Sequence, residues 1–139
     1  MPTILVVDDT PEQQAEICNQ ARKAGFQDAE INVVTNRADA DNLLAGKKFH
    51  VAVIDLCLIR GEDDDPSLGL ELIREVRDRQ PNCRIVGLTR FAHERGVDVI
   101  NCGADDFIYT GWPRIAWTEL LKNKLTLWRQ ARPRVCAIS

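Results

Sequence analysis

The sequence predicts an α/β domain built on a doubly wound parallel β-sheet. Residues 4–7 and 51–54 contain only Ile, Leu, Val and Ala, as expected for strands that are buried on both faces. Strand-like and helix-like segments alternate five times, with no internal repeat. In a chain of 139 residues this favours one domain, residues 1–132, followed by a tail at 133–139.

The first half of the chain contains three predicted strands and two predicted helices. After the strand at residues 4–7, the hydroxyl of Thr10 is expected to cap a helix. The β-branched segment 31–35 predicts a second strand, and Asn36 is expected to cap the helix that follows it. The third strand covers residues 51–56 and is apolar except for Asp55.

The second half repeats the alternation. Helical spacing of apolar residues covers 68–80, and a fourth strand is predicted at 84–89. A short helix from about 92 to 102 precedes a fifth strand at 106–110, and Pro113 is expected to open the last helix. The apolar stripe of this last helix is predicted to contain Trp117, Leu120, Leu121, Leu125 and Trp128.

The composition is that of a soluble globular protein. Hydrophobic residues make up 45% of the chain, charged residues 28%, and the net charge is −3. There is no membrane-length apolar run and no signal peptide, so we expect a cytoplasmic protein without membrane contact. The absence of a long basic block argues against nucleic-acid binding by this chain. The five cysteines lack metal-binding spacing and are expected to be reduced thiols.

Two of the predicted strands end in carboxylates. Asp8 and Asp9 follow the first strand directly, and Asp55 lies at the end of the third. If these strands are parallel neighbours, the three acids converge at the edge of the sheet where such folds bind ligands. Like charges at this distance repel unless a cation neutralises them, and Mg²⁺ prefers such oxygen ligands together with phosphate oxygens. We therefore predict a magnesium site for phosphate chemistry, the alternative being three exposed acids without a ligand.

A larger pattern connects these acids with later parts of the chain. Residues 4–9, Asp55, Thr89 and the run Gly-Ala-Asp-Asp-Phe at 103–107 follow one another at characteristic intervals. Together they resemble the receiver domain of bacterial two-component response regulators, over nearly the whole chain. The resemblance implies a flavodoxin-like, CheY-like fold with five parallel strands in the order 2-1-3-4-5.

The resemblance also implies roles for the acids. Asp55 would accept a phosphoryl group from the phosphohistidine of a sensor kinase. Asp9 and Asp55 would bind Mg²⁺ directly, Asp8 would act mostly through a bound water, and Cys57 would contribute its backbone carbonyl. Thr89 would hydrogen-bond the phosphoryl group.

The same resemblance assigns a conformational switch and reveals departures from the family pattern. Phe107 occupies the position of an aromatic switch that moves inward as Thr89 shifts. Thr110 stands where the family has a lysine, so a hydrogen-bond donor without positive charge replaces a cation. Gly111 replaces the proline that follows that lysine. Arg90 could crowd the site, or it could substitute for the missing cation.

The segment after Asp55 is predicted to be a polar loop that is longer than in the family. It contains four consecutive acids, Glu62, Asp63, Asp64 and Asp65. These acids are either solvated loop residues or, alternatively, include one that reaches the metal site or a partner.

We expect the chain to act as a signalling switch rather than a turnover enzyme. Its implied partners are a sensor histidine kinase or phosphotransfer protein and a downstream protein target. The tryptophans of the last segment suggest a surface for a homodimer. One alternative is a pseudo-receiver that serves as a docking module without phosphorylation. A Mg²⁺-dependent phosphatase with Asp55 as nucleophile is less favoured, because no second acid is placed to protonate a leaving group.

Overall fold

The computed structural model describes residues 2–56, 67–90, 93–111 and 114–131, and its centre is a five-stranded parallel sheet. The strand order is β2-β1-β3-β4-β5, which is the order implied by the resemblance, so the predicted fold class is confirmed. The strands are β1 (Ile4–Val7), β2 (Ile31–Val34), β3 (Val51–Asp55), β4 (Arg84–Thr89) and β5 (Asp106–Tyr109).

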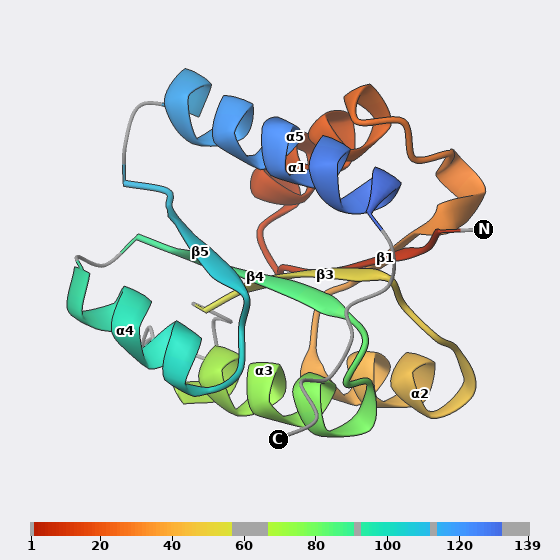
Figure 1. Cartoon of the computed structure of the whole chain (residues 1–139), viewed down its shortest axis with the longest axis vertical. Helices are drawn as coiled ribbons and strands as arrows, with labels where there is room; N and C mark the ends of the chain where they lie inside the picture. Colours follow the sequence, from red (N-terminus) through yellow and green to blue (C-terminus); the bar gives the residue numbers. More distant parts are fainter. Residues whose placement is uncertain (1, 57–66, 91–92, 112–113, 132–139) are drawn as a thin grey trace.

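Helices cover both faces of the sheet (Figure 1). One face is covered by α1 (Pro11–Lys23) and α5 (Arg114–Gln130), and the other by α2 (Arg37–Gly46), α3 (Ser67–Arg79) and α4 (His93–Asn101). A short 3₁₀ helix (Asp28–Glu30) precedes β2. No helix within the described residues has both the length and the apolar character needed to span a membrane.

The sheet separates two hydrophobic cores, because successive side chains of a strand point to opposite faces. In β1, Leu5 and Val7 pack with the residues of α2 and α3, whereas Ile4 and Val6 pack with those of α1 and α5. All four side chains are completely buried. The unbroken apolar strands in the sequence therefore correspond to a sheet that has no solvent-exposed face at its centre.

Two details of the helices differ from the sequence-based expectations. Thr10 is the N-cap residue of α1, but its side chain makes no capping hydrogen bond. Its backbone N–H instead donates to the carboxylate of Asp8, so the first turn is tied to the end of β1. In α5, Leu120 is 45% exposed, whereas Leu121 and Leu125 are buried. The buried stripe of this helix is therefore narrower than predicted.

The predicted cap of the second helix is confirmed. Asn36 caps α2, since its Oδ1 accepts a hydrogen bond from the backbone N–H of Asp39 at 2.9 Å. Gly25, which follows α1, has a φ of +109°, the left-handed conformation that favours glycine at the end of a helix. Pro113 and Trp112, together with the tail at 133–139, lie outside the described residues.

Candidate functional site

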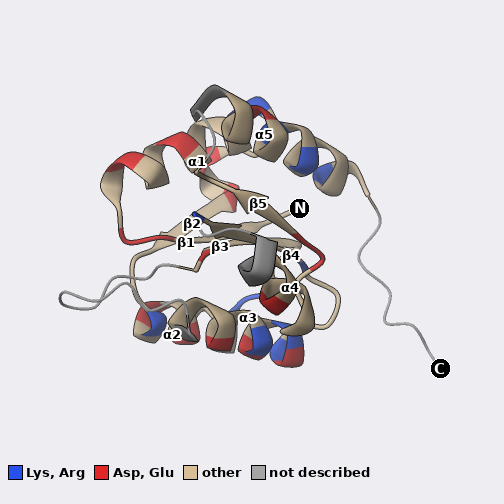
Figure 2. Ribbon diagram, turned by 90° about the vertical axis from the view of Figure 1, so that its left-hand side faces the viewer, with Lys and Arg blue, Asp and Glu red and all other residues tan. Residues whose placement is uncertain are grey.

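Three carboxylates meet at the carboxyl edge of the sheet. Asp8 and Asp9 follow β1, and Asp55 is the last residue of β3, which pairs directly with β1. One carboxylate oxygen from each residue lies within 4.8 Å of the other two. Asp8 and Asp55 are buried and Asp9 is half-buried, so the exposure assumed by the alternative interpretation is wrong, whereas the bound ion stays a prediction. Figure 2 shows acidic residues at the turn from β1 into α1.

Asp8 is held in place by the start of α1. Its Oδ1 accepts a hydrogen bond from the backbone N–H of Thr10 at 2.8 Å, and its Oδ2 accepts one from the side-chain amide of Gln13 at 2.5 Å. The side-chain amide of Gln14 donates to the backbone carbonyl of Asp8. Neither glutamine was predicted from the sequence to contact Asp8. The signal that could have found them is their position in the first turn of the helix that begins just after the acids.

Burial raises the pKa of Asp8 to about 6, compared with 3.8 for an exposed aspartate. The hydrogen bonds from Thr10 and Gln13 oppose this rise in pKa, and the negative charge of Asp9 adds to it. The carboxylate of Asp8 is therefore costly to ionise in the folded protein. A cation bound at the cluster would offset that cost.

The donor set fits a hard divalent cation. All three side chains offer carboxylate oxygens, the ligands that Mg²⁺ and Ca²⁺ prefer, and no soft sulfur or imidazole ligand belongs to the group. Asp8, Asp9 and Asp55 could therefore hold such an ion. The predicted backbone ligand Cys57 and the acids at 62–65 lie outside the described residues.

The ends of β4 and β5 complete this edge of the sheet. Leu88 pairs with Asp55, so Thr89 lies one residue further along β4, and it is fully buried. The backbone N–H of Thr110 donates to the carbonyl of Thr89 at 2.7 Å, which places Thr110 beside it at the end of β5. Arg90, the next residue of the chain after Thr89, is exposed. The position of the family lysine is thus held by a neutral, half-buried residue.

Two aromatic residues of β5 each lie against a glycine. Phe107 is half-buried, and a Cβ at Gly96 of α4 would lie 2.5 and 2.7 Å from its Cε atoms. The ring of Tyr109 lies over Gly111, where a Cβ would be 2.7 Å from Cε1. A proline at position 111 would collide with the Tyr109 ring. Glycine at position 111 therefore leaves room for this placement of the Tyr109 ring.

A third glycine sets the distance between α3 and the end of β3. A Cβ at Gly69 would lie 2.5 Å from Cα of Leu56 and 2.9 Å from the carbonyl oxygen of Asp55. Real Cβ atoms do not approach backbone atoms so closely. The glycine thus allows α3 to pack directly against the backbone that carries Asp55.

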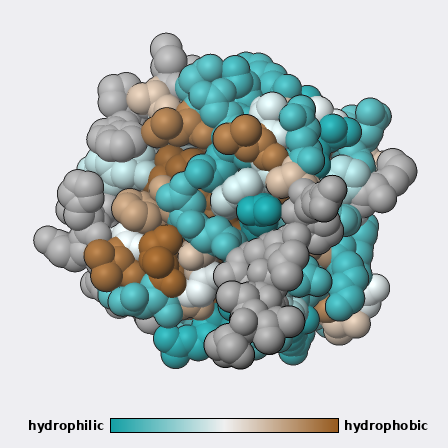
Figure 3. Space-filling model, in the orientation of Figure 1, coloured by the Kyte–Doolittle hydropathy of each residue, from teal (hydrophilic) through white to brown (hydrophobic). Residues whose placement is uncertain are grey.

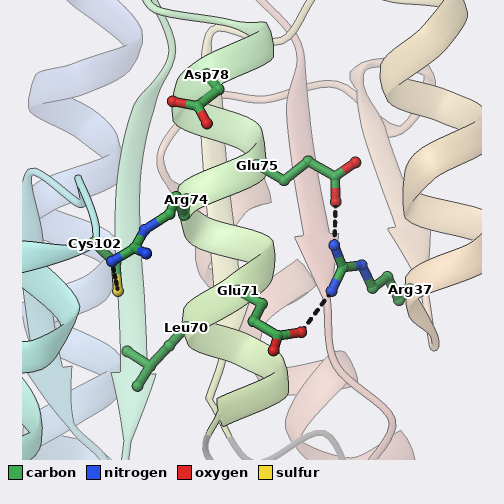
Figure 4. Close-up of a pocket in the computed structure, with 7 residues that line it drawn as sticks. All are labelled: Arg37, Leu70, Glu71, Arg74, Glu75, Asp78 and Cys102. Carbon is green, nitrogen blue, oxygen red and sulfur yellow. Dashed lines mark hydrogen bonds and ion pairs between the residues drawn. The ribbon is translucent and has the colours of Figure 1, made fainter.

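A separate groove of about 500 Å³ runs along the outer surface of α3 (Figure 4). Arg37 of α2 reaches across to Glu71 at 2.8 Å and to Glu75 at 2.6 Å. On the other side, Arg74 donates to the sulfur of Cys102 at 3.7 Å. Arg37 is paired with two glutamates of α3, so the groove carries charges of both signs. The carboxylate cluster, in contrast, carries negative charge alone.

Most of the chain is similar to proteins of known family. The family model of the response regulator receiver domain matches residues 4–121. The photosynthetic apparatus regulatory protein RegA of Rhodobacter capsulatus is 32% identical over 114 residues, which are 76% of this chain and 53% of that protein. RegA of Cereibacter sphaeroides is 28% identical over 107 residues, with the same coverage of both chains, 76% and 53%. The chain spans about half the length of these curated relatives.

Solved structures with the same fold include several response regulators. A two-component response regulator from Clostridium difficile has a TM-score of 0.72 at 19% identity, covering 92% of this chain and 95% of that one. A CheY-like receiver domain protein from Methanospirillum hungatei has a TM-score of 0.68 at 21% identity, covering 94% and 98%. A response regulator from Burkholderia pseudomallei, solved with a phosphorylated aspartic acid, a calcium ion and citrate, has a TM-score of 0.66 at 24% identity, covering 94% and 74%.

Proposed function

Because this chain belongs to the response regulator receiver domain family, we propose that it is a phosphoryl-accepting switch of two-component signalling, with Asp55 as the acceptor. The observation that carries the proposal is the convergence of Asp8, Asp9 and Asp55 within 4.8 Å at the edge of the sheet. Such a cluster is costly to build and suits a divalent ion beside a reactive oxygen.

In the proposed reaction, a carboxylate oxygen of Asp55 attacks the phosphorus of a phosphohistidine on a kinase or phosphotransfer protein. A bond forms between this oxygen and phosphorus, and the bond between phosphorus and the imidazole nitrogen breaks. The imidazole leaves with the electron pair and is protonated. Asp55 becomes an acyl phosphate, so the product is a modified protein and not a released metabolite.

The other residues of the edge would hold the ion and the phosphoryl group. Asp9 and Asp55 would bind Mg²⁺, and Asp8, fixed by Thr10 and Gln13, would support it. When bound, Mg²⁺ would supply positive charge against the phosphoryl oxygens. The hydroxyl of Thr89 would donate a hydrogen bond to the phosphoryl group.

The neutral Thr110 supports a second candidate function. Without the lysine, the site has one positive charge fewer for the phosphoryl oxygens, and the exposed Arg90 is the substitute that we consider. If no residue supplies that charge, the alternative of a pseudo-receiver, which docks partners without being phosphorylated, is favoured. Phosphodonor reactivity that is unchanged when Arg90 is replaced by alanine would exclude Arg90 as the substitute.

We further propose that the side formed by α4 and α5 contacts a downstream protein or a second copy of the chain. In α4, Val97 and Ile100 are 59% and 42% exposed, and in α5 Leu127 is 68% exposed. Figure 3 shows hydrophobic surface gathered over these two helices. Sedimentation with and without a phosphoryl mimic tests the homodimer, and a monomer under both conditions would contradict it.

Incubation with acetyl phosphate and Mg²⁺, followed by mass spectrometry of the intact chain, tests phosphorylation. We expect the mass of one phosphoryl group to be gained, and no gain when EDTA replaces Mg²⁺ or when Asp55 is replaced by asparagine. Asp78→Asn, an exposed acid of α3, is the matched control and should react normally. A folded chain that gains no mass would favour the pseudo-receiver.

A further inference from the structure

The ring of Phe107 lies where a side chain of α4 would normally be. A Cβ built on Gly96 would be 2.5 Å from Cε2 and 2.7 Å from Cε1 of the ring, and nearer still to Cζ. All three neighbouring atoms belong to the aromatic ring, and Gly96 is buried beneath it. The present position of the ring is therefore compatible only with glycine at position 96.

Glycine is otherwise a poor choice at this point of the chain. α4 has only nine residues, and Gly96 is in its interior, where glycine weakens a helix relative to alanine. Its φ is not in the left-handed region, so the backbone does not require glycine. The three atoms nearest to an added Cβ all belong to the Phe107 ring, so this ring accounts for the glycine.

Phe107 also lies between α4 and the phosphoryl-accepting edge. It is on β5, two residues before Tyr109, which pairs with Thr89 at the end of β4. Its ring packs against the core on the α4 side of the sheet. A movement of this ring would therefore change the packing of α4 on the sheet.

We propose that Gly96 is a positioning residue that sets the resting state of the switch. Because it has no side chain, it leaves a space on α4, called the seat below, which the Phe107 ring occupies. The proposal rests on the function proposed above and on the aromatic switch implied by the resemblance to receiver domains, in which Phe107 moves as Thr89 shifts. A methyl group at position 96 removes the seat and leaves the strand and the acid cluster untouched. The ring is then displaced from α4 even without a phosphoryl group, and the phosphorylated state becomes easier to reach.

The test uses fluorine-labelled phenylalanine and ¹⁹F NMR of the full chain. The chain has four phenylalanines, so Phe107→Leu assigns the Phe107 signal by its loss. In the free protein, Gly96→Ala should shift this signal toward its position in beryllofluoride-loaded protein with Mg²⁺. Gly46→Ala is the matched control, because it also replaces a glycine in a helix, but the added Cβ has nothing within 4 Å. An unmoved Phe107 signal in Gly96→Ala would overturn the proposal.

Beryllofluoride affinity separates this inference from the proposed function. We expect Gly96→Ala to bind beryllofluoride about tenfold more tightly, since overpacking of the seat destabilises only the resting state. If the original chain binds none, the proposed function fails, while the ring position in the free variant still tests the role of Gly96. If the original chain binds it and Gly96→Ala binds equally or less tightly, the inference fails alone.

A double variant keeps the proposal testable if Gly96→Ala folds poorly. Leucine at position 107 is smaller than the ring, so the added methyl group should be tolerated in its presence. We expect Gly96→Ala to lower the Tm by about 5 °C in the original chain and to leave it unchanged or raised in the Phe107→Leu background. Equal effects in both backgrounds would show that the ring does not need the seat.

Discussion

Replacing Asp8 by asparagine is expected to stabilise the fold at neutral pH in the absence of a divalent ion. Burial raises the pKa of Asp8 to about 6 in the folded protein, against 3.8 for an exposed aspartate. The folded chain thus binds the proton about a hundredfold more tightly than the unfolded chain, which at pH 7 costs the folded state about 3 kcal/mol. Asparagine has the same size without the charge. The amide of Gln13 can turn to accept a hydrogen bond from it, so most of this cost should be recovered.

The expected gain depends on pH. Because the pKa of Asp8 is raised on folding, the stability that the fold gains from a protonated Asp8 is complete below the pKa of the unfolded chain, 3.8. This stability is lost as the pH rises through about 6. The two chains should therefore be equally stable near pH 3.5. Their difference in free energy of unfolding should grow with pH and reach about 3 kcal/mol at pH 7 and above.

Urea denaturation in EDTA, followed by tryptophan fluorescence at about pH 4 and pH 7.5, measures this difference. Asp78→Asn, an exposed acid, is the control and should change stability by less than about 0.5 kcal/mol at either pH. Added Mg²⁺ should narrow the gap, because it binds more tightly to the folded chain that keeps Asp8. No gain at pH 7.5, or the same gain at pH 4, would refute the reasoning.

Three further substitutions test the edge of the sheet and its supports. Thr110→Lys should speed phosphorylation by acetyl phosphate about tenfold, because it adds a cation for the phosphoryl oxygens; an unchanged rate, measured by intact mass, would argue against a lost lysine function. Gly69→Ala should lower the free energy of unfolding by about 2 kcal/mol, because its Cβ would meet the backbone of β3, whereas Gly46→Ala should be nearly neutral in the same urea titration. Arg77→Met should cost about 2 to 4 kcal/mol by calorimetry or urea titration, since the Arg77 guanidinium is 2.7 Å from the largely buried carboxylate of Asp105; a loss below 0.5 kcal/mol would mean that this ion pair contributes little.

The sequence alone predicted the sheet and the meeting of the three acids. Apolar runs such as residues 51–54 indicate strands buried on both faces, and this pattern is local to each segment. Once the first and third strands are parallel neighbours, their carboxyl ends share one edge, so Asp8, Asp9 and Asp55 approach each other. Thr89 and Thr110 were assigned to the site by the resemblance to receiver domains, and the structure places them side by side at the ends of β4 and β5.

The tertiary structure alone decided how closely separate segments pack. The donor from Gln13 to Asp8, the raised pKa of Asp8 and the ring seat at Gly96 depend on the position of a helix relative to a strand. The exposure of Leu120 depends in the same way on the rotation of α5 about its axis. Periodicity specifies which face of an element is buried, whereas the atoms that meet across an interface are set by the packing of side-chain volumes from distant parts of the chain.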